Sequence, residues 1–432
     1  MTPDTRPTAA EAPRLGEPAP GEPTPGEPSP GDPGPGERAT PAGDARLLWT
    51  LGLASFASMA SMRACDALLP QIASEFAAST GAAAGMIAAF AVAYGLLQVV
   101  YGPMGDRHGK GRVMGCAVLG CAVANLAVAA APTLDAGIAA RALAGAAAGG
   151  IVPLSIASIG DSVDYERRQE TLARLSLATI GGMIAGQWLG GVLADALGWR
   201  AVFFLLAGGF AAVAWPVWRW ALRSPRPRAD ASSSGRYGQQ LLQLWKAPWA
   251  RTVLFVASVE GMVALAPLTL LPSHLHDAFG LSLGEAGAVT ALYGVGGLCF
   301  ALGSARLIRR LGERGLVLAG GGALAVAIAM LAIAPDWRWA CPACFVAGVG
   351  FYMLHSTMQT HATQMLPAVR GTAVSVFVVC LFGGQSLGVL LAAAVVDLAS
   401  ARWVFGVCSV VIALLCGWFA VRLSAHARAR QA

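Results

Sequence analysis

Long apolar segments alternate with short polar ones through most of the chain, from Leu47 to Leu423. Each apolar segment is close to the ~20 residues that cross a bilayer as a helix. The two-residue alternation of a strand is missing from them, and in lipid only helices and closed barrels satisfy their backbone hydrogen bonds. The pattern predicts an all-α membrane protein with twelve transmembrane helices, at 47–72, 83–104, 113–131, 134–159, 172–193, 201–222, 252–271, 286–307, 315–333, 339–362, 372–396 and 403–423.

Composition supports the membrane class. Hydrophobic residues make up 56% of the chain and charged residues 12%, whereas soluble domains carry about 25% charge. The net charge of +6 raises nucleic acid as an alternative partner. The basic residues, however, lie in short loops between apolar segments, as membrane topology demands. A lipid bilayer is therefore the expected partner, and nucleic acid is not.

Arginine and lysine are distributed unevenly between the two ends of the predicted bundle. The loops of one end hold Arg107, Lys110, Arg112, Arg167, Arg168, Arg174, Arg306, Arg309, Arg310 and Arg314, whereas those of the other hold Arg200, Arg338 and Arg402. Basic loops favour the cytoplasmic side. We expect both termini in the cytoplasm and the chain in a bacterial inner membrane, with no cleavable signal peptide before the first helix.

The segment before the first helix has low complexity. Gly-Glu-Pro recurs at Gly16, Gly21 and Gly26, and so much Pro and Gly cannot build a core. We expect a disordered cytoplasmic tail at 1–45, a six-helix bundle at 46–222, a cytoplasmic central loop at 223–250, a second six-helix bundle at 251–423 and a short cytoplasmic tail at 424–432.

An internal repeat relates the two bundles. Three short matches recur in the same order: Leu-Leu-Pro ends the first and seventh helices at Pro70 and Pro272, Tyr-Gly recurs at Tyr94 and Tyr293, and Gly-Gln-x-Leu-Gly recurs at Gln187 and Gln385. Their spacings are all close to 200 residues. One shared spacing indicates two parallel halves around an axis normal to the membrane.

The loop after the second predicted helix reads Gly-Pro-Met-Gly-Asp-Arg-His-Gly-Lys-Gly-Arg from Gly102 to Arg112. It resembles the signature loop of the major facilitator superfamily (MFS), with Gly111 in place of one basic residue. The resemblance implies the MFS fold and a cytoplasmic gate that holds the outward-facing state. Its residues would be Gly102, Gly105, Asp106, Arg107, Gly109 and Arg112. Gly102 and Gly105 would let two helices approach closely; the alternative is a plain basic turn.

Charged residues inside the predicted helices are costly and indicate function. Arg63 and Asp66 lie three residues apart on one face of the first helix, where Asp66 is either a titrating carboxylate or half of a static ion pair. Arg141 begins an Arg-x-x-x-Gly element that resembles one of the superfamily, in which it is linked to proton transfer. The alternative for Arg141 is that its side chain reaches the outer interface.

The second half offers a different polar set. Glu260 lies about nine residues into the seventh helix, near the predicted midplane, where a proton or cationic substrate site would be placed. His355 and Gln359 lie four residues apart beside Tyr352, a polar stripe that suits a cavity wall. For both, hydrogen bonds that only pack helices together are the alternative.

Three glycines of the fifth helix, Gly182, Gly186 and Gly190, form a face of small residues that favours close helix packing. Their placement resembles the antiporter motif of the superfamily, but Gln187 and Gln385 stand where that motif has Pro. This departure leaves both antiport and symport open.

The sequence points to transport rather than catalysis. It has no phosphate-binding loop, and its lone Cys-x-x-Cys at Cys341 and Cys344 has no second pair, so we expect no enzyme, metal or cofactor. The resemblance implies a secondary active transporter that moves a small solute by alternating access. We predict proton-coupled efflux of a drug, sugar or metabolite by a monomer, with proton-coupled uptake as the alternative and a non-transporting receptor as a remote one.

Overall fold

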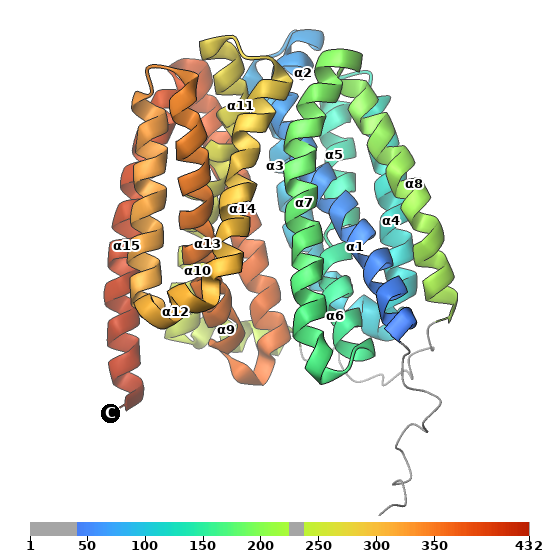
Figure 1. The fold of residues 1–432 in the computed structure, drawn as a ribbon, viewed down its shortest axis with the longest axis vertical. Coiled ribbons are helices and arrows are strands. Elements are labelled where there is room, and N and C mark those ends of the chain that lie inside the picture. Colours follow the sequence, from blue (N-terminus) through green and yellow to red (C-terminus); the bar gives the residue numbers. More distant parts are fainter. Residues whose placement is uncertain (1–40, 224–236, 432) are drawn as a thin grey trace, which may run out of the picture.

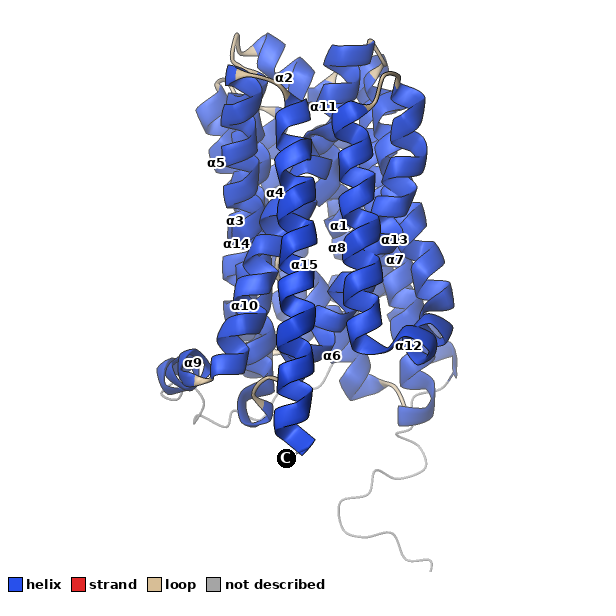
Figure 2. Ribbon diagram, turned by 90° about the vertical axis from the view of Figure 1, so that its left-hand side faces the viewer, coloured by secondary structure: helices blue, strands red, loops and turns tan. Residues whose placement is uncertain are grey.

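The computed structural model describes residues 41–223 and 237–431, and the described ranges contain helices and short turns without a strand (Figure 2). The all-α prediction is therefore confirmed. Most of the predicted tail at 1–45 and the middle of the predicted central loop lie outside the described residues.

The first half contains α1 (Pro41–Ala64), a 3₁₀ turn (Cys65–Ala67), α2 (Leu69–Glu75), α3 (Thr80–His108), α4 (Lys110–Ala129), α5 (Leu134–Ala148), α6 (Ile151–Ser162), α7 (Tyr165–Leu197) and α8 (Trp199–Arg223). The second half contains α9 (Tyr237–Lys246), α10 (Pro248–Glu260), a π-helical turn (Gly261–Leu265), α11 (Ala266–Phe279), α12 (Leu283–Ile333), α13 (Ala340–Gln364), α14 (Arg370–Leu398) and α15 (Ala401–Gln431).

Twelve crossings of the bilayer are present, as the sequence predicts. Ten helices among the described residues are long and apolar enough to cross a membrane. One of these, α12, reverses at Gly312, whose φ of 63° and ψ of 177° interrupt the helix, and so makes two crossings. The remaining crossing is α1 continued by α2 (Figure 1).

Three spans predicted as continuous helices are interrupted. The first changes to a 3₁₀ turn at Cys65–Ala67 ahead of Pro70, and the seventh contains the π-helical turn. The fourth breaks at Gly149 and Gly150. A Cβ at Gly149 would lie only 2.6 Å from the carbonyl oxygen of Tyr94, so this break lets the chain approach the backbone of α3. Hydrophobicity alone does not reveal such breaks.

Two segments predicted outside the helices are helical. The predicted central loop contains α9 and the beginning of α10, and α15 continues to Gln431 through the predicted tail at 424–432. In α9, Leu244 is buried while Leu242 and Trp245 are exposed. An amphipathic helix of this kind suits the membrane surface.

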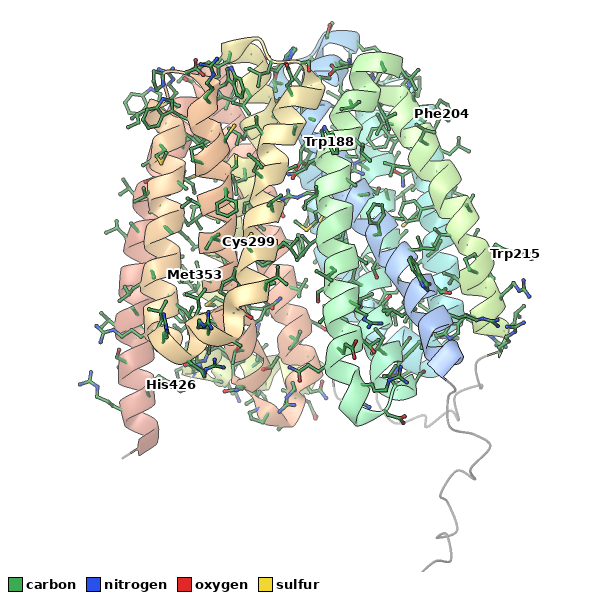
Figure 3. All side chains as sticks on the ribbon, in the orientation of Figure 1. Trp188, Phe204, Trp215, Cys299, Met353 and His426 are labelled. Carbon is green, nitrogen blue, oxygen red and sulfur yellow. The ribbon has the colours of Figure 1, made fainter. Side chains whose placement is uncertain are left out.

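The outer surface of the bundle is apolar. Phe204 and Trp215 on α8 point away from the other helices and are 50% and 68% exposed (Figure 3). Leu302 on α12 is more exposed still, at 79%. So many large apolar side chains on one surface would aggregate in water but match the acyl chains of a bilayer.

The two halves stand side by side, and they meet most closely at one end (Figure 1). We call this the capped end; it carries α2 and the last turns of α7, α11 and α14. The other, arginine-rich end carries the turns at 105–112, 162–168 and 306–314. A Cβ placed on Gly95 of α3 would lie 3.0 Å from the Cβ of Phe382 of α14. A Cβ placed on Gly102, which is on the same face of α3, would meet nothing within 4 Å. The halves therefore separate toward the arginine-rich end.

Candidate functional site

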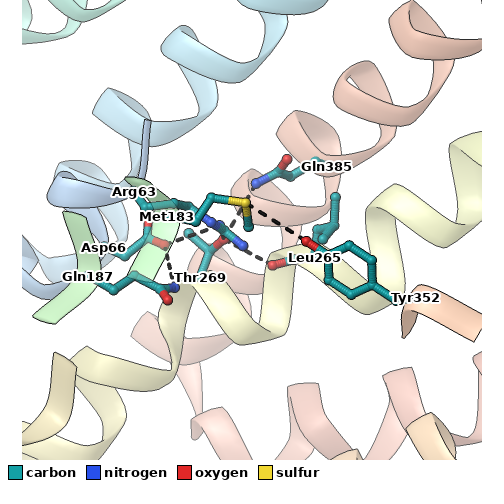
Figure 4. A network of polar contacts seen from close by, with 8 residues as sticks. All are labelled: Arg63, Asp66, Met183, Gln187, Leu265, Thr269, Tyr352 and Gln385. Carbon is teal, nitrogen blue, oxygen red and sulfur yellow. Dashed lines mark hydrogen bonds and ion pairs between the residues drawn. The ribbon is translucent and has the colours of Figure 1, made fainter. Parts of the chain in front are cut away.

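A network of buried polar side chains joins the two halves (Figure 4). Arg63 donates from Nη1 to Asp66 Oδ2 at 3.1 Å and to Thr269 Oγ1 of α11 at 3.2 Å. Gln187 of α7 donates to Asp66 at 3.4 Å, and Gln385 of α14 donates to Thr269 at 3.5 Å. Arg63 and Asp66 are 3% and 0% exposed. A guanidinium of the first half is thus held by a carboxylate of its own half and a hydroxyl of the other.

The local backbone sets up the Arg63–Asp66 pair. Arg63 lies in the last turn of α1 and Asp66 in the 3₁₀ turn that follows. Residues three positions apart lie side by side on such turns. A buried charge requires an opposite partner, which here comes from the adjacent turn.

Small residues on α7 bring Gln187 to this pair. A Cβ at Gly182 or Gly186 would overlap the carbonyl oxygen of Phe56 or Ala60, and one at Gly190 would lie 3.2 Å from that of Ala64. The backbones of α7 and α1 are therefore in contact along these three turns. This contact places the side chain of residue 187 over the end of α1.

The second half repeats the arrangement. Gly384 and Gly388 of α14 approach the carbonyl oxygens of Ser258 and Met262 as closely as their counterparts in α7 approach α1. Gln385, between them, donates to Thr269. The sequence comparison found Gln187 and Gln385 as repeat mates but did not predict that both bind into one network. Thr269 was not predicted as a site residue at all.

The network has unused hydrogen-bonding capacity. Asp66 Oδ1 and Arg63 Nε are buried and have no hydrogen-bond partner within the described part of the chain. Buried polar groups in proteins are nearly always paired. Each member of the ion pair therefore has an atom that can make a further hydrogen bond.

Arg141 of α5 is fully buried rather than at the interface, so the alternative of an interfacial side chain is wrong. Its Nη1 donates to the carbonyl oxygen of Ser61 at 3.1 Å, and its guanidinium lies over the ring of Phe90, 4.2 Å from the centroid. Cation–π contact replaces part of the lost hydration. Nε and Nη2 have no partner among the described residues, and Asp66 lies within electrostatic reach.

A second buried pair lies in the other half. Glu260, at the end of α10, is 0% exposed, and its Oε1 lies 3.2 Å from Nδ1 of His355 on α13. The sequence predicted both residues separately, and the structure brings them together. The π-helical turn begins at the next residue, Gly261, and such turns are frequent at functional sites.

Aromatic rings surround this pair. The imidazole of His355 stacks on Phe351 with ring centroids 5.0 Å apart, and Phe351 in turn contacts Tyr293 and Tyr352. The hydroxyl of Tyr293 and Oε2 of Glu260 are buried without a partner in the described ranges. The arrangement brings a carboxylate, an imidazole and aromatic rings close together.

Gln359, predicted on the same stripe, is not part of this group. It is exposed, one turn beyond His355 toward the arginine-rich end. Thr363, one turn further, donates to the backbone of its own helix. The stripe therefore extends from the buried pair to the surface rather than forming one cluster.

The segment predicted as a loop at 102–112 is helical except at Gly109, because α3 continues to His108 and α4 begins at Lys110. Asp106 and Arg107 are both exposed, and Lys110 pairs with Asp161 at the end of α6. Gly109 has φ of 93°, a conformation that favours glycine and ends α3. Gly111, which replaces a basic residue of the family signature, lies against the backbone of Ala221, where a Cβ would come within 2.9 Å.

The two glycines predicted to let helices approach behave differently. Gly105 is buried, and a Cβ there would lie 2.7 Å from Leu154 of α6. Gly102 faces open space, so the expected close approach at this position is wrong for the described conformation.

Comparison with known proteins decides the family. A model of the major facilitator superfamily matches residues 51–388, which include most of both halves and most of the chain. The chain belongs to this superfamily. A probable transporter of Streptomyces coelicolor, SCO4007, is 28% identical over 416 residues, covering 88% of each chain. The multidrug export protein EmrB of Haemophilus influenzae is 29% identical over 165 residues, covering 38% of this chain and 32% of EmrB.

Solved structures agree on the fold. The nucleoside transporter NupG (D323A mutant) superimposes with a TM-score of 0.71 at 15% identity, covering 88% of this chain and 99% of that one. This MFS protein is therefore a multi-pass integral membrane transporter with bacterial relatives, built as two six-helix halves. Its buried Arg63–Asp66 pair lies where the halves meet.

Proposed function

We propose that this MFS protein exports a small solute in exchange for protons, by alternating access. The observation that carries the proposal is the buried Arg63–Asp66 pair, whose arginine also binds Thr269 of the other half. An ionisable pair inside a membrane bundle is expensive and is retained where it serves proton or substrate movement. This one couples a titratable carboxylate to a contact between the moving halves.

Proton binding at Asp66 would change that contact directly. A proton on Oδ1, the oxygen without a partner, neutralises the carboxylate and removes most of its attraction for Arg63. The guanidinium of Arg63 can then move away from Asp66, and this movement weakens its hydrogen bond to Thr269. The two halves can then rock against each other. The positive charge of Arg141 favours release of the proton, which returns Asp66 to its charged form.

The Glu260–His355 pair would serve the substrate or a second proton. A solute between the halves meets the unpartnered carboxylate oxygen of Glu260 and the hydroxyl of Tyr293. Aromatic faces and a carboxylate suit a solute that has an apolar body and a polar or positive group.

One comparison supports export: a similar protein is a multidrug export protein. The arginine-rich end, toward which the halves separate, is expected to face the cytoplasm, and in this conformation an exporter would collect its solute there. Proton-coupled uptake is the alternative, and Gln187 and Gln385 favour it, since they replace the Pro of the antiporter motif.

In the opposite state, the end of α3 with Asp106 would form the gate. Asp106, Arg107 and Arg112 lie at the arginine-rich end, where they would meet the other half when that end closes. We propose that they hold the closed form of this end, in a monomer of a bacterial inner membrane.

The test begins with a screen of an overexpressing strain against drugs and metabolites to find a solute that it excludes. The purified protein is then reconstituted in liposomes with that solute. Movement against its gradient, driven by an imposed pH difference and abolished by a protonophore, is the expected result. Transport that ignores the pH difference would remove proton coupling, and solute uptake in the direction of proton entry would favour the symporter.

A further inference from the structure

We propose that Asp195 and Asp397 are paired gate residues, which close the capped end by binding the helix N-termini of the opposite half. Asp195 is in the last turn of α7 and Asp397 in the last turn of α14. The proposal stands whether or not transport is coupled to protons, because it concerns only how the two halves are held together.

Asp195 binds the beginning of α12. Its Oδ1 accepts from the backbone N–H of Leu283 at 3.1 Å, and its Oδ2 accepts from that of Gly284 at 2.8 Å. The two flanking N–H groups are satisfied within the second half by a capping box, in which Ser282 and Glu285 bind each other's backbone. Four N–H groups of one helix are thus capped, two of them from the other half of the molecule.

Asp397 does the same for α3. Its Oδ1 accepts from the N–H of Gly81 at 3.1 Å, and its Oδ2 accepts from Ser79 Oγ at 2.6 Å. Ser79 itself caps α3 by accepting from the N–H of Ala82. The carboxylate of the second half therefore completes the N-cap of a helix in the first half.

We call the contact of Asp195 with α12 and that of Asp397 with α3 the two joints of the capped end. The internal repeat relates them to each other. Asp195 and Asp397 are 202 positions apart, and so are Gly81 and Leu283, whose N–H groups they bind. Neither aspartate was singled out from the sequence. Two copies of one arrangement, each crossing between the halves in the opposite direction, point to a role in joining the halves and not only in capping a helix.

The charge of each aspartate is favourable only when the two halves are in contact. A negative charge in the last turn of a helix is unfavourable to its own helix, whose C-terminal end carries partial negative charge. At the N-terminus of another helix the same charge is favourable. Each aspartate is therefore destabilising in an isolated half and stabilising when the halves meet at the capped end.

Both joints require a glycine. A Cβ at Gly81 would overlap the carboxylate of Asp397, and a Cβ at Gly284 would lie 3.2 Å from Asp195 Oδ2 and 2.9 Å from Val192. Below the Asp195 joint, Gly191 and Gly287 bring the backbones of α7 and α12 into contact. Opening this end must break both joints and expose four donors, three N–H groups and one hydroxyl, to water.

The inference is tested by amide hydrogen exchange, measured by mass spectrometry on the full chain in lipid nanodiscs without solute or pH gradient. The variants are Asp195→Asn, Asp397→Asn and the double change. We expect exchange in 281–290 and 79–88 to rise about two- to fivefold in the single variants and more in the double one, as expected for loss of a charge at a helix end. Each single variant should also raise exchange at the other joint, because the two joints close the same end of the molecule and loosening one opens that end.

Asp336→Asn is the matched control. Asp336 caps the N–H of Arg338 at the same end, within its own half, at 2.8 Å. It should raise exchange only around its own turn. Equal effects of Asp336→Asn at 79–88 and 281–290, or changes confined to the mutated joint, would overturn the gate assignment. Because no transport is measured, the result does not depend on the proposed proton coupling.

Discussion

Glu75 and Arg200 tie the first crossing to the start of α8 at the capped end. Arg200 donates to Glu75 Oε1 from Nε at 2.9 Å and from Nη2 at 2.7 Å, and Trp199 donates to Oε2 at 2.5 Å. Partial desolvation acts to raise the pKa of Glu75, but these hydrogen bonds and the charge of Arg200 outweigh it and hold the pKa below its ordinary value. The carboxylate is therefore stabilised in the folded state.

The sign of the resulting pH dependence follows from linkage. A lowered folded pKa gives stability that is complete above the unfolded pKa, about 4.3, and is lost as the pH falls through the folded value. We expect the thermal midpoint of Glu75→Gln to lie below that of the wild type at pH 7, and the difference to shrink toward pH 3. A difference that is the same at every pH would contradict this account. Glu170→Gln, which breaks an exposed pair within α7, is the control.

Gly186 tests the contact between α7 and α1. A Cβ there would overlap the carbonyl oxygen of Ala60, and a backbone atom cannot move aside without shifting the helix. We expect Gly186→Ala to lower the free energy of unfolding by about 1–3 kcal/mol, the usual range for overpacking, and to lower the thermal midpoint.

Gly208→Ala of α8 is the matched control, because nothing lies within 4 Å of its Cβ position. Its midpoint should stay near that of the wild type. Equal midpoints for the two variants in the same detergent would show that the α7–α1 contact has room for a methyl group.

Sequence reasoning found the charged members of the site but not their neutral partners. A charge inside an apolar segment stands out, so Arg63, Asp66, Arg141 and Glu260 could be singled out. Thr269 looks like any helix residue until folding brings α11 to α1. Pairings across more than 90 positions, such as Glu260 with His355, depend on the tertiary arrangement and have no local signal.

At the scale of elements, the last turn of α3 has a proposed role that depends on the conformation. Asp106 is exposed here, whereas a gate would engage it when the arginine-rich end closes. We expect Asp106→Asn to reduce the rate of transport at least about tenfold, the effect of losing roughly 1.4 kcal/mol from a charge-assisted contact, while expression and thermal midpoint stay near the wild type.

Asp135→Asn, which changes an exposed acid at the start of α5, controls for loss of surface charge. It should leave the rate nearly unchanged. A normal transport rate for Asp106→Asn in liposomes would contradict the proposed gate role of Asp106.

Most elements could be predicted because the bilayer imposes their length and apolarity. Their interruptions could not. The break at Gly149 and Gly150 reflects close contact with α3, and α9 is too short and too polar to register as a span. Both depend on what packs beside the segment rather than on its own pattern.

At the scale of the whole molecule, the repeat predicted two related halves, and the structure shows what each contributes where they meet. Arg63 and Asp66 belong to the first half, and Thr269 and the Glu260–His355 pair to the second. At the capped end the two aspartates bind in opposite directions. The central network and the two aspartate contacts both hold the halves together in this conformation, so the proposed cycle has to release both before the capped end opens.

The most direct test of proton coupling at Asp66 compares two transport modes of Asp66→Asn in liposomes. One mode is exchange of labelled for unlabelled solute without a gradient, and the other is accumulation driven by a pH difference. The account predicts that exchange continues while pH-driven accumulation is lost, because the permanently neutral side chain cannot bind and release a proton. Accumulation by Asp66→Asn that matches the wild type would contradict it.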